Sequence, residues 1–288
     1  MLDYSLEPVS YDARPLKIIR PPRISLLTFV SGIASLCTSS DLLYTLTALR
    51  LSVRYKQSVL GWIWAVIQPL SLMIIYTLVF TRVLTVQTGG IAYPVFAFAG
   101  LLPWLFFATA VTNATTSLVN NSYLLTRVSF PREMVPISYV AAAVVDFLIA
   151  SFVLAGLMLY YRVAPKATIF LSIPIIFFLI LFGTGVSLLL AALHARFRDI
   201  GVGMPLLLQV WMFATPIVYP LDAVPARFRA LCLLNPLAGI VDGFRRAVLQ
   251  GLPPEPSTFL YPALSSIVVF IIAYIVFKNL DANMADVI

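Results

Sequence analysis

A series of long apolar runs, separated by short polar stretches, is the feature that most constrains this chain. A helix needs about 20 mostly apolar residues to cross the hydrocarbon core of a bilayer. Inside lipid its backbone polar groups must be bonded within the segment, which favours helices. The runs that meet this length are 59–80, 93–118, 135–160, 167–193, 201–219 and 260–277. We therefore predict an all-α integral membrane protein with six transmembrane helices.

Composition supports a single membrane domain. Hydrophobic residues make up 61% of the chain and charged residues 11%, whereas a soluble domain has about 25% charged residues. The sequence predicts a polar N-terminal segment over 1–58 and a transmembrane domain over 59–288. The net charge is +7, but most cations lie beside the apolar runs, where contact with anionic lipid headgroups explains them better than nucleic-acid binding.

The distribution of Lys and Arg predicts the orientation. Cytoplasmic loops of membrane proteins carry an excess of these residues, and six spans place both termini on one side. We expect a cytoplasmic side that includes Arg14, Lys17, Arg20, Arg23, Arg50, Arg54, Lys56, Arg127, Arg132, Arg196, Arg198 and Lys278. The opposing observation is a cationic group in the last outer connection, made of Arg227, Arg229, Arg245 and Arg246. The balance predicts that both termini are cytoplasmic.

Two stretches are predicted to be helical without crossing the bilayer. Ser40 is suited to cap a helix over 41–56, whose apolar stripe is formed by Leu42, Leu43, Leu46, Leu49 and Val53. This pattern is typical of an amphipathic helix lying in the membrane interface. Over 223–251, Asn235 and Pro236 separate two short helices, and Gly251 ends the second. Each is too short to cross, so we expect interfacial or re-entrant helices on the outer side.

Motifs for catalysis are missing from the sequence. It contains no phosphate-binding loop of the form GxxxxGK[ST]. The single histidine, His194, lies beside Arg196 at a predicted helix end, and no cluster of metal ligands or paired carboxylates accompanies it. We therefore predict neither an enzyme nor a metal site, and an active transporter built on this chain would need a separate ATPase.

Asp146 is the one acidic residue inside a predicted span. An unpaired charge there would be costly, so the side chain must be paired, hydrated or protonated. One interpretation places it beside a water-filled path or in a lock between helices. The other is an interhelical hydrogen bond with a neighbour such as Gln209, and Gln68 is a further buried polar candidate.

Aromatic residues are frequent near the span ends, which permits two interpretations. Belts at the membrane interfaces and ordinary packing are the default. Alternatively, some of them line a channel on which sugar rings slide. Together with Gln68, the candidate channel residues are Trp62, Trp64, Tyr76, Phe80, Trp211, Phe213 and Tyr219.

Four segments make the chain resemble a known family. RYKQSVLGWIWAVIQP spans 54–69, FPRE spans 130–133, ARFRDI spans 195–200, and NPLAGIVDGFRRAVLQG spans 235–251. In this order they are similar to the membrane subunits of bacterial ABC-2-type exporters of O-antigen, capsular polysaccharide and teichoic acid. Arg127 stands where relatives more often have lysine. The first 35 or so residues match nothing in that pattern.

The resemblance implies a homodimer that forms a channel and pairs with two copies of an ATP-binding subunit. ATP and Mg would then be bound by the partner and no cofactor by this chain. Residues that would touch the ATPase are Arg50, Arg54, Tyr55, Lys56, Arg127, Phe130, Pro131, Arg132 and Glu133. Those that would form the outer gate are Asn235, Pro236, Asp242, Arg245 and Arg246.

The function that follows is export of a lipid-linked polysaccharide, O-antigen foremost. An exporter of a drug or small lipid with the same architecture is the nearest alternative. A polytopic glycosyl- or acyltransferase using Asp146 is the rival from another class, although it would need more acid, base or metal groups than these spans offer.

Overall fold

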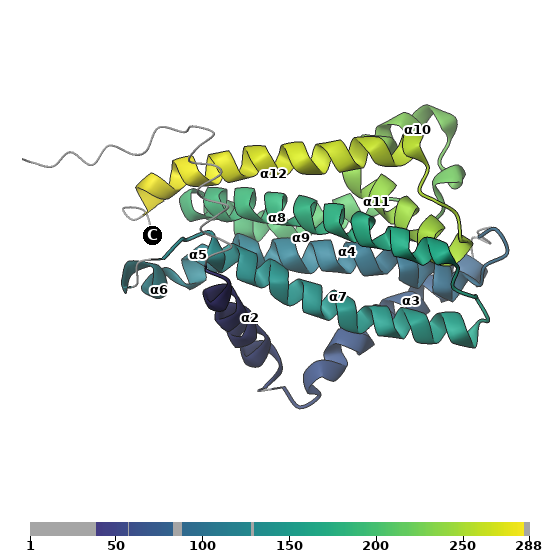
Figure 1. The fold of residues 1–288 in the computed structure, drawn as a ribbon, viewed down its shortest axis with the longest axis horizontal. Coiled ribbons are helices and arrows are strands. Elements are labelled where there is room, and N and C mark those ends of the chain that lie inside the picture. The colour runs from purple at the N-terminus through teal and green to yellow at the C-terminus, as the bar shows by residue number, and fades with distance from the viewer. Residues whose placement is uncertain (1–38, 57, 83–87, 128–129, 285–288) are drawn as a thin grey trace, which may run out of the picture.

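Helices make up all the regular structure that the computed structural model describes, which covers residues 39–56, 58–82, 88–127 and 130–284 (Figure 1). Five helical stretches are long and apolar enough to cross a membrane: Gly61–Thr81, Tyr93–Thr115, Met134–Tyr160, Ala167–Arg196 and Pro256–Asp281. They contain α3 (Trp64–Arg82), α4 (Tyr93–Thr115), α7 (Met134–Tyr160), α8 (Ser172–Arg196) and α12 (Pro256–Met284). Short 3-10 turns, η1 (Gly61–Ile63) and η2 (Ala167–Leu171), precede α3 and α8. These helices correspond to five of the six predicted spans.

The remaining predicted span, 201–219, is shorter in the structure. It forms α9 (Asp199–Phe213), a helix of 15 residues, which at 1.5 Å per residue is about 22 Å long. The predicted end at 219 is wrong because the chain turns at 214–218, where the Ile217 amide bonds to the Thr215 carbonyl. Pro216 has no amide to continue the helix.

The long helices run roughly alongside one another, with α4 in the middle of the bundle (Figure 1). In α4, 78% of the most apolar stretch is buried, against 11% in the helix that contains α3. Helices α8 and α12 approach each other closely, since a Cβ at Gly185 would lie 2.9 Å from the Phe270 Cα. Glycine is required there because the two backbones leave no room for a side chain.

The two ends of the bundle differ in charge and in their short helices. At one end lie α5 (Ser117–Asn120), α6 (Ser122–Arg127), the beginning of α7 and the last turns of α8 and α12 (Figure 1). Several cations of the predicted cytoplasmic side gather there, namely Arg127, Arg132, Arg196, Arg198 and Lys278. The opposite end carries α10 (Ala226–Leu233), α11 (Pro236–Arg245) and the π-helical turn η4 (Arg246–Gln250).

The short helices of the opposite end follow the prediction closely. Asn235 is the N-cap of α11, and its side chain accepts a bond from the Leu237 amide while Pro236 takes the first helical position. Gly251 ends η4 in the left-handed conformation, with φ at 68°. Most of α11 is buried, and it contacts α4, α8 and α12, so it is inserted into the bundle. α10, by contrast, is largely exposed.

The predicted amphipathic helix is α2 (Ser40–Tyr55), which lies across α7 (Figure 1). Its N-cap is Ser39, with no side-chain cap bond, so the prediction that Ser40 caps the helix is wrong. Within the apolar stripe Leu46 is buried, whereas Leu49 and Val53 are exposed. Part of the stripe therefore packs on the protein, and the rest is free to enter a membrane interface. The predicted features of residues 1–38 lie outside the described residues.

Candidate functional site

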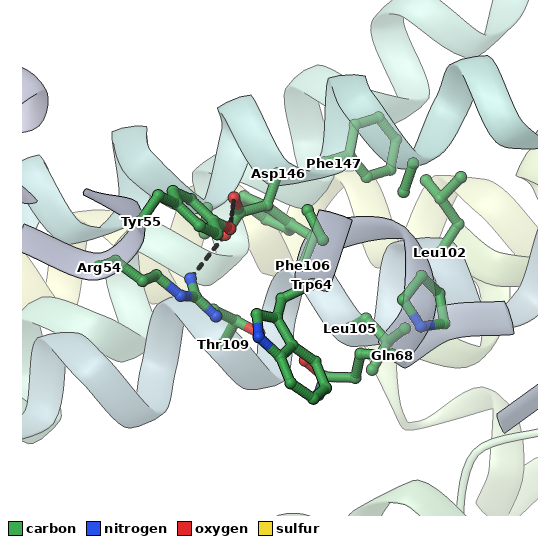
Figure 2. A pocket seen from close by; sticks show the side chains of 14 residues that line it. Arg54, Tyr55, Trp64, Gln68, Leu102, Leu105, Phe106, Thr109, Asp146 and Phe147 are labelled. Carbon is green, nitrogen blue, oxygen red and sulfur yellow. Dashed lines mark hydrogen bonds and ion pairs between the residues drawn. The ribbon is translucent and has the colours of Figure 1, made fainter. Parts of the chain in front are cut away.

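Asp146 on α7 is bonded by two consecutive residues of α2. Arg54 Nη1 lies 2.6 Å from Asp146 Oδ2, and the Tyr55 hydroxyl donates to Asp146 Oδ1 at 2.6 Å (Figure 2). The Asp146 side chain is 17% exposed and that of Arg54 is 41% exposed. The carboxylate in the middle of α7 thus has both its charge and its lone pairs satisfied by the end of α2.

Asp146 therefore makes interhelical hydrogen bonds, as the second of the two interpretations expects, but with partners other than Gln209. Gln209 on α9 is exposed in the single chain and is not a buried polar residue, so that prediction is wrong. Tyr55 is buried, and burial together with the bond to Asp146 raises the pKa of its phenol. The hydroxyl therefore stays protonated and remains a donor to the carboxylate.

A cleft lies next to this cluster, between α2, α3, α4 and α7 (Figure 2). The space between its lining atoms, with the open solvent at its mouth included, is ≈ 520 Å³. Arg54, Gln68, Thr109 and Asp146 supply the polar side of its lining, and Trp64 is its large aromatic side chain from α3. Polar groups at membrane depth are favourable only where they meet water, a partner or a ligand. The cleft is therefore the best candidate for a polar surface inside the bundle.

The predicted channel aromatics separate into two groups. Trp62, Trp64 and Phe213 are each about half exposed, at 46%, 49% and 60%, and Gln68 is exposed as well. Trp62 stacks on Tyr55 with 4.3 Å between ring centroids, which places it beside the Arg54 cluster. These side chains are accessible in the single chain.

The other aromatics are used for packing. Tyr76 and Phe80 belong to a row of rings that continues to Tyr93, with Phe80 and Tyr93 stacked at 6.0 Å. Trp211 packs edge-on against Phe107 at 5.1 Å. For Tyr76, Phe80 and Trp211, packing within the protein therefore describes the single chain better than exposure to a channel.

A second groove lies between the end of α9 and α10. Its empty volume, with the open solvent at its mouth included, is ≈ 1230 Å³, and Trp211, Phe213, Tyr219, Phe228 and Leu231 are among the residues that line it. Asn235 bridges the two sides, since its Oδ1 accepts from Trp211 Nε1 at 3.1 Å and its Nδ2 donates to the Thr215 hydroxyl at 2.7 Å. The candidate gate residue Asn235 therefore also holds the turn after α9.

The outer-gate arginines have different environments. Arg245 is 3% exposed, and its guanidinium donates to the backbone carbonyls of Phe96, Pro216 and Ile217. A Cβ at Gly100 would collide with this guanidinium, so α4 admits Arg245 only because residue 100 is glycine. Arg246 instead lies 3.4 Å from the Glu255 carboxylate at the surface. Arg245 thus anchors the backbone inside the protein. It is not part of the exposed cationic group of the last outer connection.

The predicted ATPase-docking residues differ in how accessible they are. Lys56 and Arg127 are exposed, while Phe130 and Pro131 are partly buried. Arg50 is committed to the protein, because it donates to Asn121 Oδ1 at 2.8 Å and lies over the Tyr139 ring. Accessible docking charge is therefore concentrated on fewer residues than the sequence predicted.

The position of Glu133 disagrees with its predicted role as an ATPase contact. Its side chain is 0% exposed, and Oε1 lies 2.5 Å from Lys278 Nζ on α12. The prediction that this carboxylate contacts the ATPase is therefore wrong, because the carboxylate is not accessible to another protein. Arg132 likewise lies 3.1 Å from the Asp281 carboxylate. Sequence reasoning missed Lys278 and Asp281 as partners, although their spacing of three residues at a helix end places them on one face.

No group of three or more His, Cys, Asp or Glu residues that could hold a metal occurs among the described residues. His194 is buried at the end of α8, and its Nδ1 accepts a bond from the Gly201 amide at 3.1 Å. It serves to join α8 to α9.

Comparison with known proteins decides the family. The ABC-2 type transporter family matches residues 41–249. The chain belongs to the ABC-2 type transporter family. The match runs from α2 to η4, so it includes the cleft, the groove at the end of α9 and the inserted α11. The five long apolar helices agree with the fold of an ABC-2 membrane domain.

Curated relatives cover most of this ABC-2 chain. The O-antigen export system permease protein RfbA of Klebsiella pneumoniae is 32% identical over 250 residues, which are 86% of this chain and 95% of that protein. A protein with the same name from Myxococcus xanthus is 31% identical over 55% of this chain and 60% of its own length. The polysialic acid transport protein KpsM of Escherichia coli is 26% identical over 80% of this chain and 90% of its own length. The relatives are transport proteins.

Proposed function

We propose that this chain is the permease subunit of an ABC transporter that exports a lipid-linked polysaccharide, O-antigen foremost, across the bacterial inner membrane. The observation that carries the proposal is the match to an O-antigen export permease along 86% of this chain and 95% of that relative. A match of this extent covers most of the chain rather than one shared motif.

The path for the substrate is proposed to include the cleft of Figure 2 and the exposed residues Trp62, Trp64, Gln68 and Phe213. An exposed glutamine on an apolar helix is costly against lipid and favourable against a water-filled path. Flat tryptophan rings bind sugar rings through their apolar faces without fixing one orientation. A second copy of the chain would cover the little-buried α3 and the short α9 and so complete the channel.

The ATPase is proposed to bind the end of the bundle that carries α5 and α6, where the cationic residues gather. By the positive-inside rule this end faces the cytoplasm, so both termini do too. Lys56 and Arg127 are two exposed cations that are available for charge-assisted contacts with the partner. ATP and Mg would be bound by two ATPase copies, and α10 and α11 would gate the outer end.

The first experiment is co-purification in detergent with the product of the neighbouring gene, which we expect to be an ABC ATPase, followed by ATPase assays of the complex and of this subunit alone. We expect a complex of two permeases and two ATPases that hydrolyses ATP, and no turnover by the permease alone. A permease that purifies without an ATPase, or that transfers glycosyl or acyl groups on its own, would refute the proposal.

The exported compound is tested in cells. Deletion of the gene is expected to remove a surface glycan and to leave drug sensitivity unchanged, apart from effects of the lost glycan itself. Complementation with the wild-type chain should restore the glycan. Unchanged surface glycans together with new drug sensitivity would favour the exporter of a drug or small lipid instead.

A further inference from the structure

Two ion pairs attach the start of α7 to the end of α12. In one pair α12 supplies the carboxylate, and in the other it supplies the cation. Arg132 Nη1 lies 3.1 Å from Asp281 Oδ1 and also donates to the Asp281 carbonyl at 2.8 Å. The next residue, Glu133, lies 2.5 Å from Lys278 Nζ. Two consecutive residues thus hold two residues of α12 that are three positions apart, which fixes both the position and the rotation of the helix end.

Burial makes the second pair more than a surface contact. The Glu133 side chain is 0% exposed, whereas that of Lys278 is 33% exposed. Tyr274, one turn before Lys278, donates to the same carboxylate oxygen at 3.4 Å. Within the described residues Oε2 of Glu133 has no hydrogen-bond partner. The negative charge of Glu133 is therefore compensated mainly by α12.

Apolar packing surrounds the two ion pairs. A hydrophobic cluster at this end joins residues of α5, α7, α8 and α12, with Tyr274 and Phe277 of α12 fully buried in it. Phe130, which begins the FPRE segment, packs against this cluster. Phe130, Arg132 and Glu133 are therefore all held at this end of the bundle, while the neighbouring Arg127 remains exposed.

The other end of α12 contacts the inserted helix α11. At Gly239 of α11 a Cβ would lie 2.3 Å from the Thr258 carbonyl, so the two backbones are nearly in contact. Helix α12 has 29 residues and is continuous from this point to the ion pairs (Figure 1). It is one continuous helix that connects the two ends of the bundle, with Pro262 near its start.

We propose that Lys278 and Asp281 are positioning residues that hold the 130–133 segment for the ATPase and transmit its movement through α12 to α11. The inference rests on the proposed function, because it presupposes an ATPase bound at this end. Glu133 and Arg132 act by binding α12, and the contacts with the ATPase are made by accessible neighbours such as Arg127.

The test uses the full-length permease reconstituted with its ATPase. Lys278→Met removes the cation, Lys278→Arg keeps it, and Glu133→Gln/Lys278→Met removes both charges and leaves no unpaired carboxylate. Arg162→Met, at the far end of α7, is the matched control because Arg162 is exposed and distant from the ion pairs. For each variant we would measure thermal unfolding of the isolated permease, the Kd for the ATPase, and kcat and KM for MgATP in the complex.

Lys278→Met is expected to weaken ATPase binding by about tenfold or more, because an unpaired buried carboxylate displaces the segment. Lys278→Arg should stay within about threefold of the wild type, since it retains the charge. The double variant decides between positioning and mere stability. It should recover the unfolding temperature while ATPase binding or kcat stays low and KM for MgATP, set within the ATPase, stays unchanged.

Recovery of ATPase binding and kcat in the double variant would overturn the inference, because the ion pair would then serve stability alone. Wild-type binding and kcat in Lys278→Met would overturn it as well. If Lys278→Met does not fold, the double variant and Lys278→Arg still give the answer. Failure of the wild-type permease to bind any ATPase would instead refute the proposed function, so the two failures are distinguishable.

Discussion

Arg54 and Asp146 form an ion pair at 2.6 Å although they are 92 residues apart in the chain. The pair joins the end of the amphipathic helix α2 to the middle of α7. Because Tyr55 bonds the other carboxylate oxygen, α2 is held to α7 by two consecutive side chains. Movement of α2 at the membrane interface would therefore change the polar side of the adjacent cleft.

Asp146→Ala should destabilise the protein by about 1–3 kcal/mol, because the buried Tyr55 hydroxyl loses its acceptor. The ion-pair part of this loss is small, since Arg54 is partly exposed. Asp146→Asn keeps an acceptor and should cost less. The exposed Asp41→Asn on α2 is the control and should change stability by under about 0.5 kcal/mol. Unfolding in detergent measures all three, and equal stability of Asp146→Ala and Asp41→Asn would contradict the assignment.

The neighbours Arg245 and Arg246 should respond very differently to substitution. Arg245→Met leaves carbonyls of Phe96, Pro216 and Ile217 without donors in a buried site, at a cost of at least about 2 kcal/mol. Arg246→Met breaks only a partly exposed pair with Glu255 and should cost about 0–1 kcal/mol. Thermal unfolding of the two variants side by side makes the comparison. Similar losses would mean that Arg245 is not the anchor of the turn after α9.

Gly185→Ala should separate α8 from α12, since the new Cβ would meet the Phe270 backbone at 2.9 Å. Overpacking of this kind costs about 1–3 kcal/mol. Gly156→Ala on α7 is the matched control, because nothing lies within 4 Å of its Cβ position. It should be neutral or stabilising by up to about 1 kcal/mol through helix propensity. A Gly185→Ala protein as stable as Gly156→Ala would show that the helices lie farther apart.

Trp64→Ala should lower polysaccharide export without lowering stability, because the ring is 49% exposed and lines the cleft. Trp64→Phe should retain most of the export, since a flat apolar face remains. Phe152→Ala, which removes a 79% exposed ring of α7 that is not part of the cleft lining, is the control and should export normally. Surface glycan per cell, at equal permease abundance, is the measurement. Normal export by Trp64→Ala would remove this residue from the path.

Local features of the fold were predictable from the sequence. The long apolar helices, the breaks at Asn235 and Gly251, and the extra helix before the first span all follow from residues next to one another in the chain. The end of α9 was not predictable from hydropathy, because the residues after Phe213 are themselves apolar. Its helix ends where Pro216 and the carbonyls bound by Arg245 form a turn.

The sequence by itself determined that the chain is an all-α membrane protein, because long apolar segments must satisfy their backbone groups internally and helices do so locally. Only the tertiary structure decided which polar groups meet. Asp146 binds Arg54 and Tyr55 rather than Gln209, and Glu133 is enclosed by α12 rather than exposed to a partner. The physical reason is that lipid and protein core are both apolar, so the sequence pattern of a membrane helix says little about which face meets another helix. The rotation and order of the packed helices determine those contacts.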